Sequence, residues 1–344
     1  MISTSNTTPE GTGALGLLSG VGRAPVATNP DGPDRPMRFT DPMDDGPIPL
    51  PDGLTARPLA LTDAHAVFEV MAAQELHDTG QVGVEEEDIL GDWQRPSFAI
   101  APNTLGVFAG ETLVAYSEFS GGDRGDAAVH PDHRGQGLGT SLALWMQDRA
   151  RTAGAFRVGM PVPEGSPGDR LLEALGYDVR WTSWVLALPD GRRIEDQPLP
   201  GGYAIRSATE DDHRAAWTVI EDAFLEWSDR DRQPFEDFAA QVVRRPGFQP
   251  WNLRVVTDPA DQIVGAAFVF VAGEVGYVEK VAVKPAQRGR GLARALLADA
   301  FARSRANGAT ASMLSTDSRT GALGLYEKVG MEVVAVWLHR SIAL

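Results

Sequence analysis

The sequence predicts an α/β protein built from two tandem copies of one domain, each a mixed, mostly antiparallel sheet flanked by helices. Three observations support this fold class. A length of 344 residues is enough for about two domains of roughly 150 residues each. One block of sequence occurs twice at a fixed spacing. Within each copy, apolar runs typical of strands alternate with helical patterns, and hairpins also occur.

The repeat is visible at two separate places in one register. Residues 129–139 and 283–293 are identical at six of eleven positions, and their offset is 283 − 129 = 154. Residues 171–176 and 325–330 match at the same offset, 325 − 171 = 154. A period of this size is that of a whole domain, so it indicates a duplicated domain and not a solenoid of short repeats.

Composition shifts place the boundaries of the two copies. Residues 1–47 are rich in Gly, Pro, Ser, Thr and Asp and poor in large apolar groups, so we expect a disordered tail. Residues 189–202 are rich in proline and glycine and form the expected linker. The two domains are therefore predicted at residues 48–188 and 203–344.

Within the second copy, β-branched and aromatic runs predict strands, and apolar residues at helical spacing predict helices. The helix that begins at Gly291, for example, has Leu292, Leu296 and Phe301 on one face. The expected strands are 203–207, 253–256, 263–271, 276–283, 311–315 and 333–338, and the expected helices are 211–224, 291–306 and 320–329. The first copy repeats the pattern, with strands at 113–119 and 126–129 and a main helix at 137–153.

The charge balance and the absence of cysteine exclude several classes of function. The chain has 47 acidic and 31 basic residues, and its formal net charge of -16 disfavours nucleic acid and anionic membranes as partners. Without cysteine there are no disulfides, thiolate metal sites or cysteine nucleophile, which suits a reducing compartment. No apolar run approaches the roughly 18 residues of a membrane span. We therefore expect a cytoplasmic protein, monomeric or homodimeric.

Each copy places a basic, glycine-rich turn between a strand and a helix, at residues 134–139 and 288–293. The first turn of a helix has backbone N–H groups without intrahelical partners, and the helix dipole adds positive potential there. Glycine lets a phosphate approach the backbone, and arginine supplies charge and donors. Neither turn has the third glycine of a dinucleotide fingerprint at the right spacing, and the Gly-Lys-Ser/Thr of a P-loop is absent. They therefore predict an anion cradle of another kind.

This pattern resembles the acyl-CoA pyrophosphate motif of the GNAT N-acetyltransferase superfamily: a strand is followed by Arg-x-x-Gly-x-Gly/Ala and then by a helix. The segment from Ala322 through Leu325 and Tyr326 to Gly330 resembles the superfamily's C-terminal motif. The resemblance implies acetyl-CoA as acyl donor, no metal, and direct attack by a primary amine of a small molecule or peptide. The cofactor-binding residues that it implies are Val281, Ala282, Val283, Arg288, Gly289, Arg290, Gly291, Leu292 and Ala293 in the second copy, and Ala128, Val129, Arg134, Gly135, Gln136, Gly137 and Gly139 in the first.

The chemistry requires a base and an acid. An alkyl amine has a pKa near 10, so neutralising it at pH 7 costs about 4 kcal/mol, and a carboxylate commonly removes the proton. Glu279 lies two residues before Val281, so alternation predicts that it shares a face with Val281 and Val283. Glu274 or a water molecule is an alternative base. Tyr326 occupies the position of the superfamily's general acid, which protonates the departing thiolate.

The first copy lacks both groups. At the 154-residue offset, Gly125 corresponds to Glu279 and Leu172 to Tyr326, since 279 − 154 = 125 and 326 − 154 = 172. We therefore predict catalysis in the second copy, and a degenerate first copy that binds CoA weakly or structurally. Two departures from the superfamily pattern put substrate inference in doubt: Arg319 replaces a frequent Asn, and Met331 replaces an aromatic residue.

Several alternatives stay open. A non-catalytic acyl-CoA-binding sensor is the competing class of function. The acceptor could be an amino sugar, a polyamine, an amino-acid derivative, a drug or a protein terminus. Residues 315–318 are polar and either bind substrate or cap the next helix. His130 and His133 lack a third ligand and do not predict a metal site. Trp217 falls at helical spacing with Ile220 and Phe224, which indicates a core position.

Overall fold

The computed structural model describes residue 48 and residues 50–344. The disordered tail predicted for residues 1–47 lies outside the described residues. We refer to residues 54–187 as lobe 1 and to residues 204–343 as lobe 2.

The two lobes have matching strand orders along the chain. Lobe 1 contains β1 (Leu54–Arg57), α1 (Ala64–Thr79), α2 (Glu86–Trp93), α3 (Ile100–Asn103), β2 (Thr104–Ala109), β3 (Thr112–Gly121), β4 (Arg124–Val129), α4 (Leu138–Thr152), β5 (Arg157–Pro163), α5 (Pro167–Ala174) and β6 (Asp178–Ala187). Lobe 2 contains β7 (Ala204–Ser207), α6 (His213–Phe224), α7 (Phe235–Gln241), β8 (Leu253–Thr257), β9 (Ile263–Ala272), β10 (Val275–Val283), α8 (Leu292–Ala306), β11 (Ala311–Asp317), α9 (Leu323–Lys328) and β12 (Glu332–Ala343). The strands and helices predicted for the second copy are confirmed to within a few residues, whereas α7 was not predicted.

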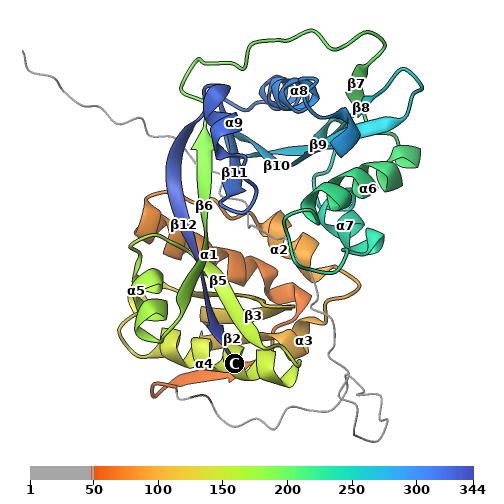
Figure 1. Ribbon diagram of the computed structural model, residues 1–344. Helices are drawn as coiled ribbons and strands as arrows, with labels where there is room; N and C mark the ends of the chain where they lie inside the picture. Colours follow the sequence, from red (N-terminus) through yellow and green to blue (C-terminus); the bar gives the residue numbers. More distant parts are fainter. Residues whose placement is uncertain (1–47, 49) are drawn as a thin grey trace, which may run out of the picture.

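All described strands belong to one 12-stranded sheet, in the order β1-β2-β3-β4-β5-β12-β6-β11-β10-β9-β8-β7. Adding six to each lobe 1 strand number, and subtracting six from each lobe 2 number, reproduces this order read backwards. The duplicated sequence therefore forms a pseudo-two-fold arrangement whose axis passes between β12 and β6. Figure 1 shows these two long strands side by side, running from one lobe into the other.

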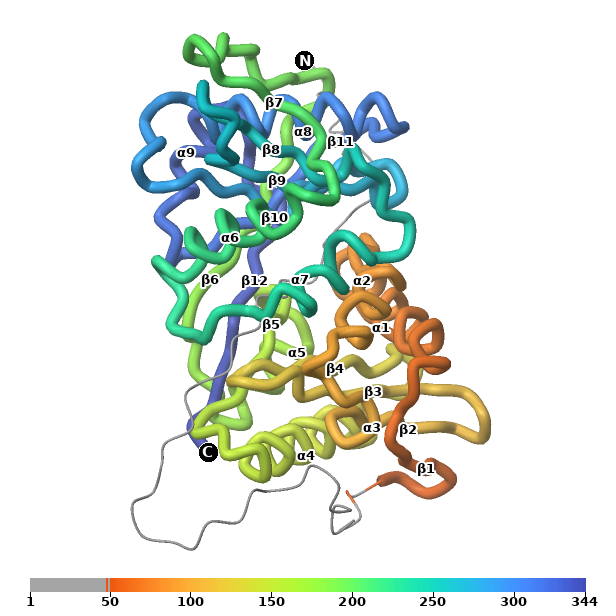
Figure 2. The backbone as a smooth tube through the Cα atoms, turned by 90° about the vertical axis from the view of Figure 1, so that its right-hand side faces the viewer, coloured from red at the N-terminus to blue at the C-terminus, as the bar shows by residue number. Residues whose placement is uncertain are grey.

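The last strand of each lobe pairs with the other lobe. β6 pairs with β11 from Met313↔Ala187 to Asp317↔Ser183, and β12 pairs with β5 from Trp337↔Pro163 to Ala343↔Arg157. The final strand was expected to end near residue 338. It is longer because its second half finds its partner in lobe 1, a pairing that local sequence does not reveal. The C-terminus consequently lies beside α4 of lobe 1 (Figure 2).

The sheet has two differently covered faces. α4 and α8 pack on one face, where Leu142 of α4 clusters with Ala127 and Val129. We call this the α4/α8 face. α1, α2, α6 and α7 cover the other, the α1/α6 face, where Ile220 of α6 clusters with Ala282. The two faces follow from strand alternation, since neighbouring residues on β4 and β10 point to opposite sides.

Candidate active site

Each lobe contains a notch where two parallel strands diverge. In lobe 1, β4 and β5 are paired only at Arg124↔Gly159. In lobe 2, β10 and β11 are paired from Val275↔Ala311 to Val278↔Leu314, and no further along. Beyond these points the strand backbones lose their ladder partners, so their N–H groups are free to bind something else.

Backbone direction identifies which N–H groups face each notch. His130 donates to Val114 O on β3, at 2.9 Å, and Lys284 donates to Val264 O on β9, at 2.8 Å. Because successive N–H groups alternate across a strand, the Val129 and Val283 amides point the other way, into the notches. Ala127 and Val281, two residues earlier, do the same.

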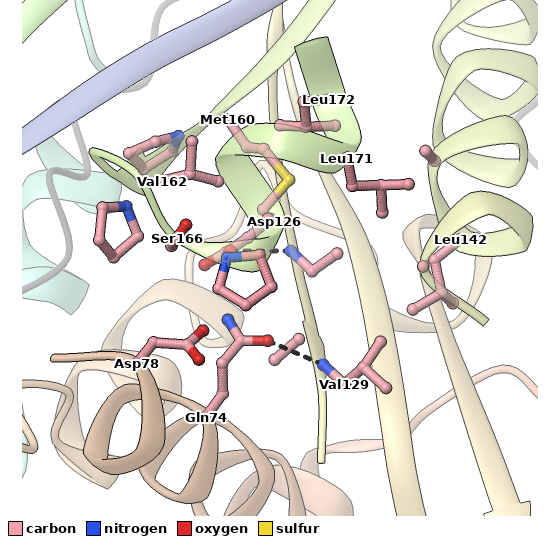
Figure 3. Close-up of a pocket in the computed structure, with 18 of the residues that line it drawn as sticks. Gln74, Asp78, Asp126, Val129, Leu142, Met160, Val162, Ser166, Leu171 and Leu172 are labelled. Carbon is pink, nitrogen blue, oxygen red and sulfur yellow. Dashed lines mark hydrogen bonds between the residues drawn. The ribbon is translucent and has the colours of Figure 1, made fainter. Parts of the chain in front are cut away.

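The two notches differ in how these amides are satisfied. In lobe 1, Ala127 N donates to Asp126 Oδ1 at 2.8 Å, and Val129 N donates to Gln74 Oε1 at 3.0 Å (Figure 3). In lobe 2, no described side chain accepts from the Val281 or Val283 amide. In lobe 1 the notch amides therefore already donate to side chains of the same lobe, whereas in lobe 2 two notch amides remain available to bind a ligand carbonyl.

The predicted glycine turns open directly onto the main helices. Gly137 precedes α4 with φ 88°, and Gly291 precedes α8 with φ 79°. This left-handed conformation favours glycine, and it leaves the amides of the first helical turn without side-chain obstruction. Gly135 and Gly289 also have positive φ angles, 76° and 74°. Both turns thus have the geometry of an anion cradle.

The cradle arginines brace the turn. Arg134 Nη1 and Nη2 donate to the two oxygens of Asp78 at 2.6 and 2.9 Å, and its Nε reaches Val129 O at 3.4 Å. Arg288 repeats this arrangement, with Glu226 as its carboxylate at 2.7 and 2.5 Å and Val283 O at 3.3 Å. Each guanidinium ties the turn to the end of its strand. This bracing differs from the anion contact that the sequence suggested for them.

The linker covers the cradle of lobe 2. A Cβ built at Gly291 would lie 3.2 Å from Gln197 Oε1, whereas one at Gly137 would meet nothing within 4 Å. Tyr203 donates to Gln287 Oε1 at 2.7 Å, and Arg294 reaches the Glu195 carbonyl at 3.3 Å. A ligand at the head of α8 must therefore displace one flexible glutamine side chain.

A cavity of about 400 Å³ passes through the lobe 1 notch. On the α1/α6 face it extends to Tyr277, Ser315 and Trp337, which all come from lobe 2. We call this end, between the two notches, the central chamber. Of the lobe 1 residues predicted to bind cofactor, those that line the cavity are Ala128, Val129, Arg134, Gly135, Gly137 and Gly139, whereas Gln136 does not.

Asp126 is a candidate base that sequence reasoning missed. It lines the cavity, and burial raises the pKa of its carboxyl to about 7, with the nearby Glu118 carboxylate adding to the rise. The fixed offset concealed it, because β10 contains a bulge between Val278 and Lys280. Because the bulge inserts Glu279 into β10, the 154-residue offset aligned Glu279 with Gly125. Asp126, one residue later, was therefore not considered as its counterpart.

The bulge also changes where Glu279 points. Val281 packs against the two apolar clusters that contain Leu292 and Leu297 of α8, as alternation predicts. The Glu279 carboxylate, in contrast, lies near Tyr277 and Asp88, on the α1/α6 face. Burial is the main cause of the raised pKa of both groups, and the Glu279 carboxylate adds to the rise. The prediction that Glu279 shares a face with Val281 and Val283 is therefore wrong. Its carboxylate forms an ion pair with Lys280.

Tyr326 lies on the other side of the lobe 2 notch. It packs against the cluster that contains Leu314, Val281 and the α8 residue Leu297. Burial raises the pKa of its phenol to about 12, so the hydroxyl is protonated at neutral pH and can act as a donor. Glu279 and Tyr326 thus flank the notch from opposite faces. Glu274, the alternative base, lies before β10, and its carbonyl accepts from Thr310 N at 2.8 Å, away from the diverging strands.

In the polar segment 315–318, Ser315 lines the cavity and Asp317 accepts from the Arg319 backbone amide and side chain. α9 has no side-chain cap, so these residues do not cap that helix. Trp217 packs edge-on against Phe235 at 5.9 Å, in the core as predicted. Among residues 50–344, no group of three or more His, Asp or Glu side chains is arranged to hold a metal ion. No helix in this part of the chain is long and apolar enough to cross a bilayer.

Asp126→Asn is expected to raise the free energy of unfolding above that of wild type at pH 8, and to have a smaller stabilising effect at pH 4. A folded-state pKa near 7 and an unfolded value near 4 mean that the native carboxyl keeps a proton which the unfolded chain releases. Asp126 therefore lowers the free energy of unfolding as pH rises from about 4 to 7. The effect is on the order of 1–2 kcal/mol, because the cavity gives the carboxyl partial access to water.

Melting temperatures of wild type and variant across this pH range test the prediction, with exposed Asp132→Asn as the matched control. The asparagine can still accept from the Ala127 amide, so the comparison isolates the charge. A difference between wild type and Asp126→Asn that does not change with pH would contradict it.

Comparison with known proteins agrees with this geometry. The profile of the acetyltransferase (GNAT) family matches twice, at residues 68–177 and 207–331. A mycothiol acetyltransferase from Salinispora arenicola is 30% identical over 237 residues, which cover 65% of this chain and 75% of that protein. With its two tandem GNAT domains, this chain therefore resembles mycothiol synthase.

Solved structures support the same architecture. A GCN5-related N-acetyltransferase from Sphaerobacter thermophilus superposes with a TM-score of 0.65 at 27% identity, over 86% of this chain and 97% of that one. A tandem GNAT protein from the clavulanic acid biosynthesis pathway, at 15% identity, shares the fold with a TM-score of 0.62, over 84% of this chain and 98% of that one. These relatives do not favour the non-catalytic sensor. The chain belongs to the acetyltransferase (GNAT) family, contains that family's domain twice, and is an N-acetyltransferase that uses an acyl-CoA donor.

Proposed function

We propose that the protein transfers the acetyl group of acetyl-CoA to a primary amine of a small molecule, and that lobe 2 performs the reaction. The observation that carries the choice of lobe is the pair of uncapped notch amides, at Val281 and Val283. Main-chain donors aimed at a carbonyl oxygen stabilise the negative charge that develops there during acyl transfer. In lobe 1 the corresponding amides already donate to Gln74 and Asp126.

The proposed reaction uses three groups of lobe 2. Glu279 accepts a proton from the ammonium form of the acceptor, which enters from the α1/α6 face. The neutral nitrogen attacks the thioester carbon while the notch amides hold its oxygen. The C–S bond then breaks, and the Tyr326 hydroxyl gives its proton to the departing thiolate. The nitrogen loses its second proton, which restores the Tyr326 phenol by way of solvent, so an amide and free CoA result. The pyrophosphate lies at the head of α8, after displacement of Gln197.

A second assignment is favoured by one observation, the cavity through the lobe 1 notch. In that case acetyl-CoA would bind along α4, and Asp126 would be the base. The cavity lacks a phenol at Leu172, and its amides would first have to exchange their side-chain acceptors. The central chamber lies between the two notches, so the same acceptor site could serve either lobe.

Three other observations bear on the acceptor, the oligomeric state and the cellular compartment. The name of the relative, mycothiol acetyltransferase, refers to a small molecule, which supports a small-molecule acceptor. The shared sheet completes both notches within one chain, which supports a monomer as the working unit. The cysteine-free composition supports a reducing compartment, and we propose the cytoplasm.

Tyr326→Phe and Asp126→Asn, assayed separately for acetyl transfer to an amine panel, distinguish the two lobes. We expect Tyr326→Phe to lower kcat by about 10- to 100-fold, because it removes only the proton donor. Asp126→Asn should leave kcat close to that of wild type. A large loss in Asp126→Asn with an intact Tyr326→Phe would transfer the reaction to lobe 1.

A further inference from the structure

A cluster of basic and aromatic side chains borders the central chamber on the α1/α6 face. It consists of Arg124, Arg180, Trp181, Arg319 and His339, and we call it the Trp181 cluster. Two of its members lie two residues along a strand from a residue that lines the chamber, and therefore on the same face of the sheet. Arg124 follows this spacing from Asp126 on β4, and His339 from Trp337 on β12. The cluster therefore continues the floor of the chamber, between the two notches.

Three guanidinium groups surround one indole ring. Their central carbons lie 3.8 Å (Arg319), 4.9 Å (Arg180) and 5.6 Å (Arg124) from the Trp181 ring centroid. Arg319 is held between two indoles, since it also lies 4.8 Å from the Trp227 centroid. The His339 ring stacks on Trp181 at 4.4 Å. Such packing fixes the planes of the cations and leaves their edges to bind a partner.

Two carboxylates beside the cluster each pair with one of its arginines. Asp123 pairs with Arg180, and Asp317 pairs with Arg319 at 2.6 Å. Burial lowers the pKa of Arg124 to about 10, Asp123 and Asp126 oppose that shift, and the neighbouring Arg319 and Arg180 add to it. Three guanidinium groups thus lie close together around one indole ring.

Buried hydrogen-bond donors in the cluster lack acceptors. Arg124 Nη1 donates to His339 Nδ1 at 3.1 Å, so the imidazole proton is on Nε2. That Nε2, Trp181 Nε1 and the neighbouring Ser183 Oγ are buried without a hydrogen-bond partner among the described residues. Arg319 uses Nε and Nη2 on Asp317, while its Nη1 has no described partner and its side chain is about one third exposed. Buried donors in folded proteins normally have acceptors, so this set indicates a missing acceptor.

We propose that the Trp181 cluster binds an anionic group of the acceptor, a carboxylate or a phosphate, so that the preferred substrate is a primary amine that also carries an anion. This inference rests on the proposed function, because it places the acceptor in the central chamber. It adds the substrate class, which the sequence left open. Guanidinium edges and indole and imidazole N–H groups together match the oxygens of such an anion.

A binding experiment tests the inference without turnover. Protein with 15N-labelled tryptophan is titrated with 4-aminobutyrate, 3-aminopropylphosphonate and, as the neutral match, butylamine. Trp181→Phe assigns the indole N–H resonance. We expect one or both anionic probes to shift this resonance and butylamine to leave it in place. A shift with the carboxylate alone or the phosphonate alone identifies the anion. If neither anionic probe shifts the resonance, or if butylamine shifts it equally, the inference is overturned.

A substitution links the site to specificity. Arg319→Gln should raise KM for the anionic acceptors by about tenfold or more, while KM for butylamine and kcat stay unchanged. Arg303→Gln, an exposed arginine on α8, is the matched control. If Arg319→Gln raises KM for butylamine and for the anionic acceptors alike, the cluster is only structural and the inference fails. A protein that acetylates none of the amines contradicts the proposed function, and the indole titration still decides the anion site.

Discussion

Glu279→Gln is expected to lower kcat for acetyl transfer by about 10²- to 10⁴-fold at pH 7, the contribution typical of a general base. The physical reason is the charge of the acceptor. An amine with a pKa near 10 is almost entirely protonated at pH 7, and the ammonium form has no lone pair for attack. A glutamine at this position keeps the size and hydrogen bonding of the side chain and loses its ability to accept the proton.

The pH dependence distinguishes a base from a structural carboxylate. As pH rises toward 10, solvent deprotonates the amine and the need for a base falls. The ratio of wild-type to variant kcat should therefore shrink between pH 7 and 10. Glu274→Gln, which changes a carboxylate outside the notch, is the matched control and should behave like wild type. A ratio that stays constant over this pH range would show that Glu279 acts only through the local structure.

Gly159→Val is expected to lower the free energy of unfolding by about 3 kcal/mol or more, the upper range for overpacking. Gly159 lies on β5 opposite Ser341 of β12. A Cβ built there would overlap the Arg340 carbonyl oxygen and the Ser341 backbone. These are main-chain atoms of the inserted strand, so no side-chain rotation can relieve the clash. The substitution must push β12 out of lobe 1 and weaken both lobes together.

Denaturant unfolding, monitored by two spectroscopic signals, measures this change in the free energy of unfolding. Gly168→Ala is the matched control, because a Cβ at Gly168 in α5 meets Val162 at an ordinary 3.4 Å. Helix propensity predicts that this control is neutral or slightly stabilising. If Gly159→Val unfolded with wild-type stability, β12 would not lie beside β5 and the exchange of strands between lobes would be incorrect.

The sequence predicted most of the local structure because that information is local. Apolar periodicity and the glycine turns specify α4 and α8, and the 154-residue repeat specifies that each is one of a pair. The pairing of β12 with β5 was not predictable in this way. Its second half, from Trp337 onward, is an ordinary strand by composition, and its partner lies more than 150 residues earlier in the chain.

The site was predictable only in part, for two physical reasons. A single bulged residue, Glu279, breaks the alternation on which facing was inferred, so it concealed Asp126 as well. The state of the notch amides depends on Gln74, which α1 brings to β4 from 55 residues away. Spacing within a motif contains no information about such a cap.

The central claim is that the productive acyl-CoA site lies at the head of α8, and calorimetric titration of acetyl-CoA into Gly291→Val and Gly137→Val tests it most directly. Each substitution places a β-branched residue at a positive φ angle at the start of a main helix. We predict that Gly291→Val weakens acetyl-CoA binding by about 100-fold, about 2.7 kcal/mol, and abolishes turnover, while Gly137→Val leaves turnover intact. Unchanged binding and turnover in Gly291→Val, with both lost in Gly137→Val, would contradict the account.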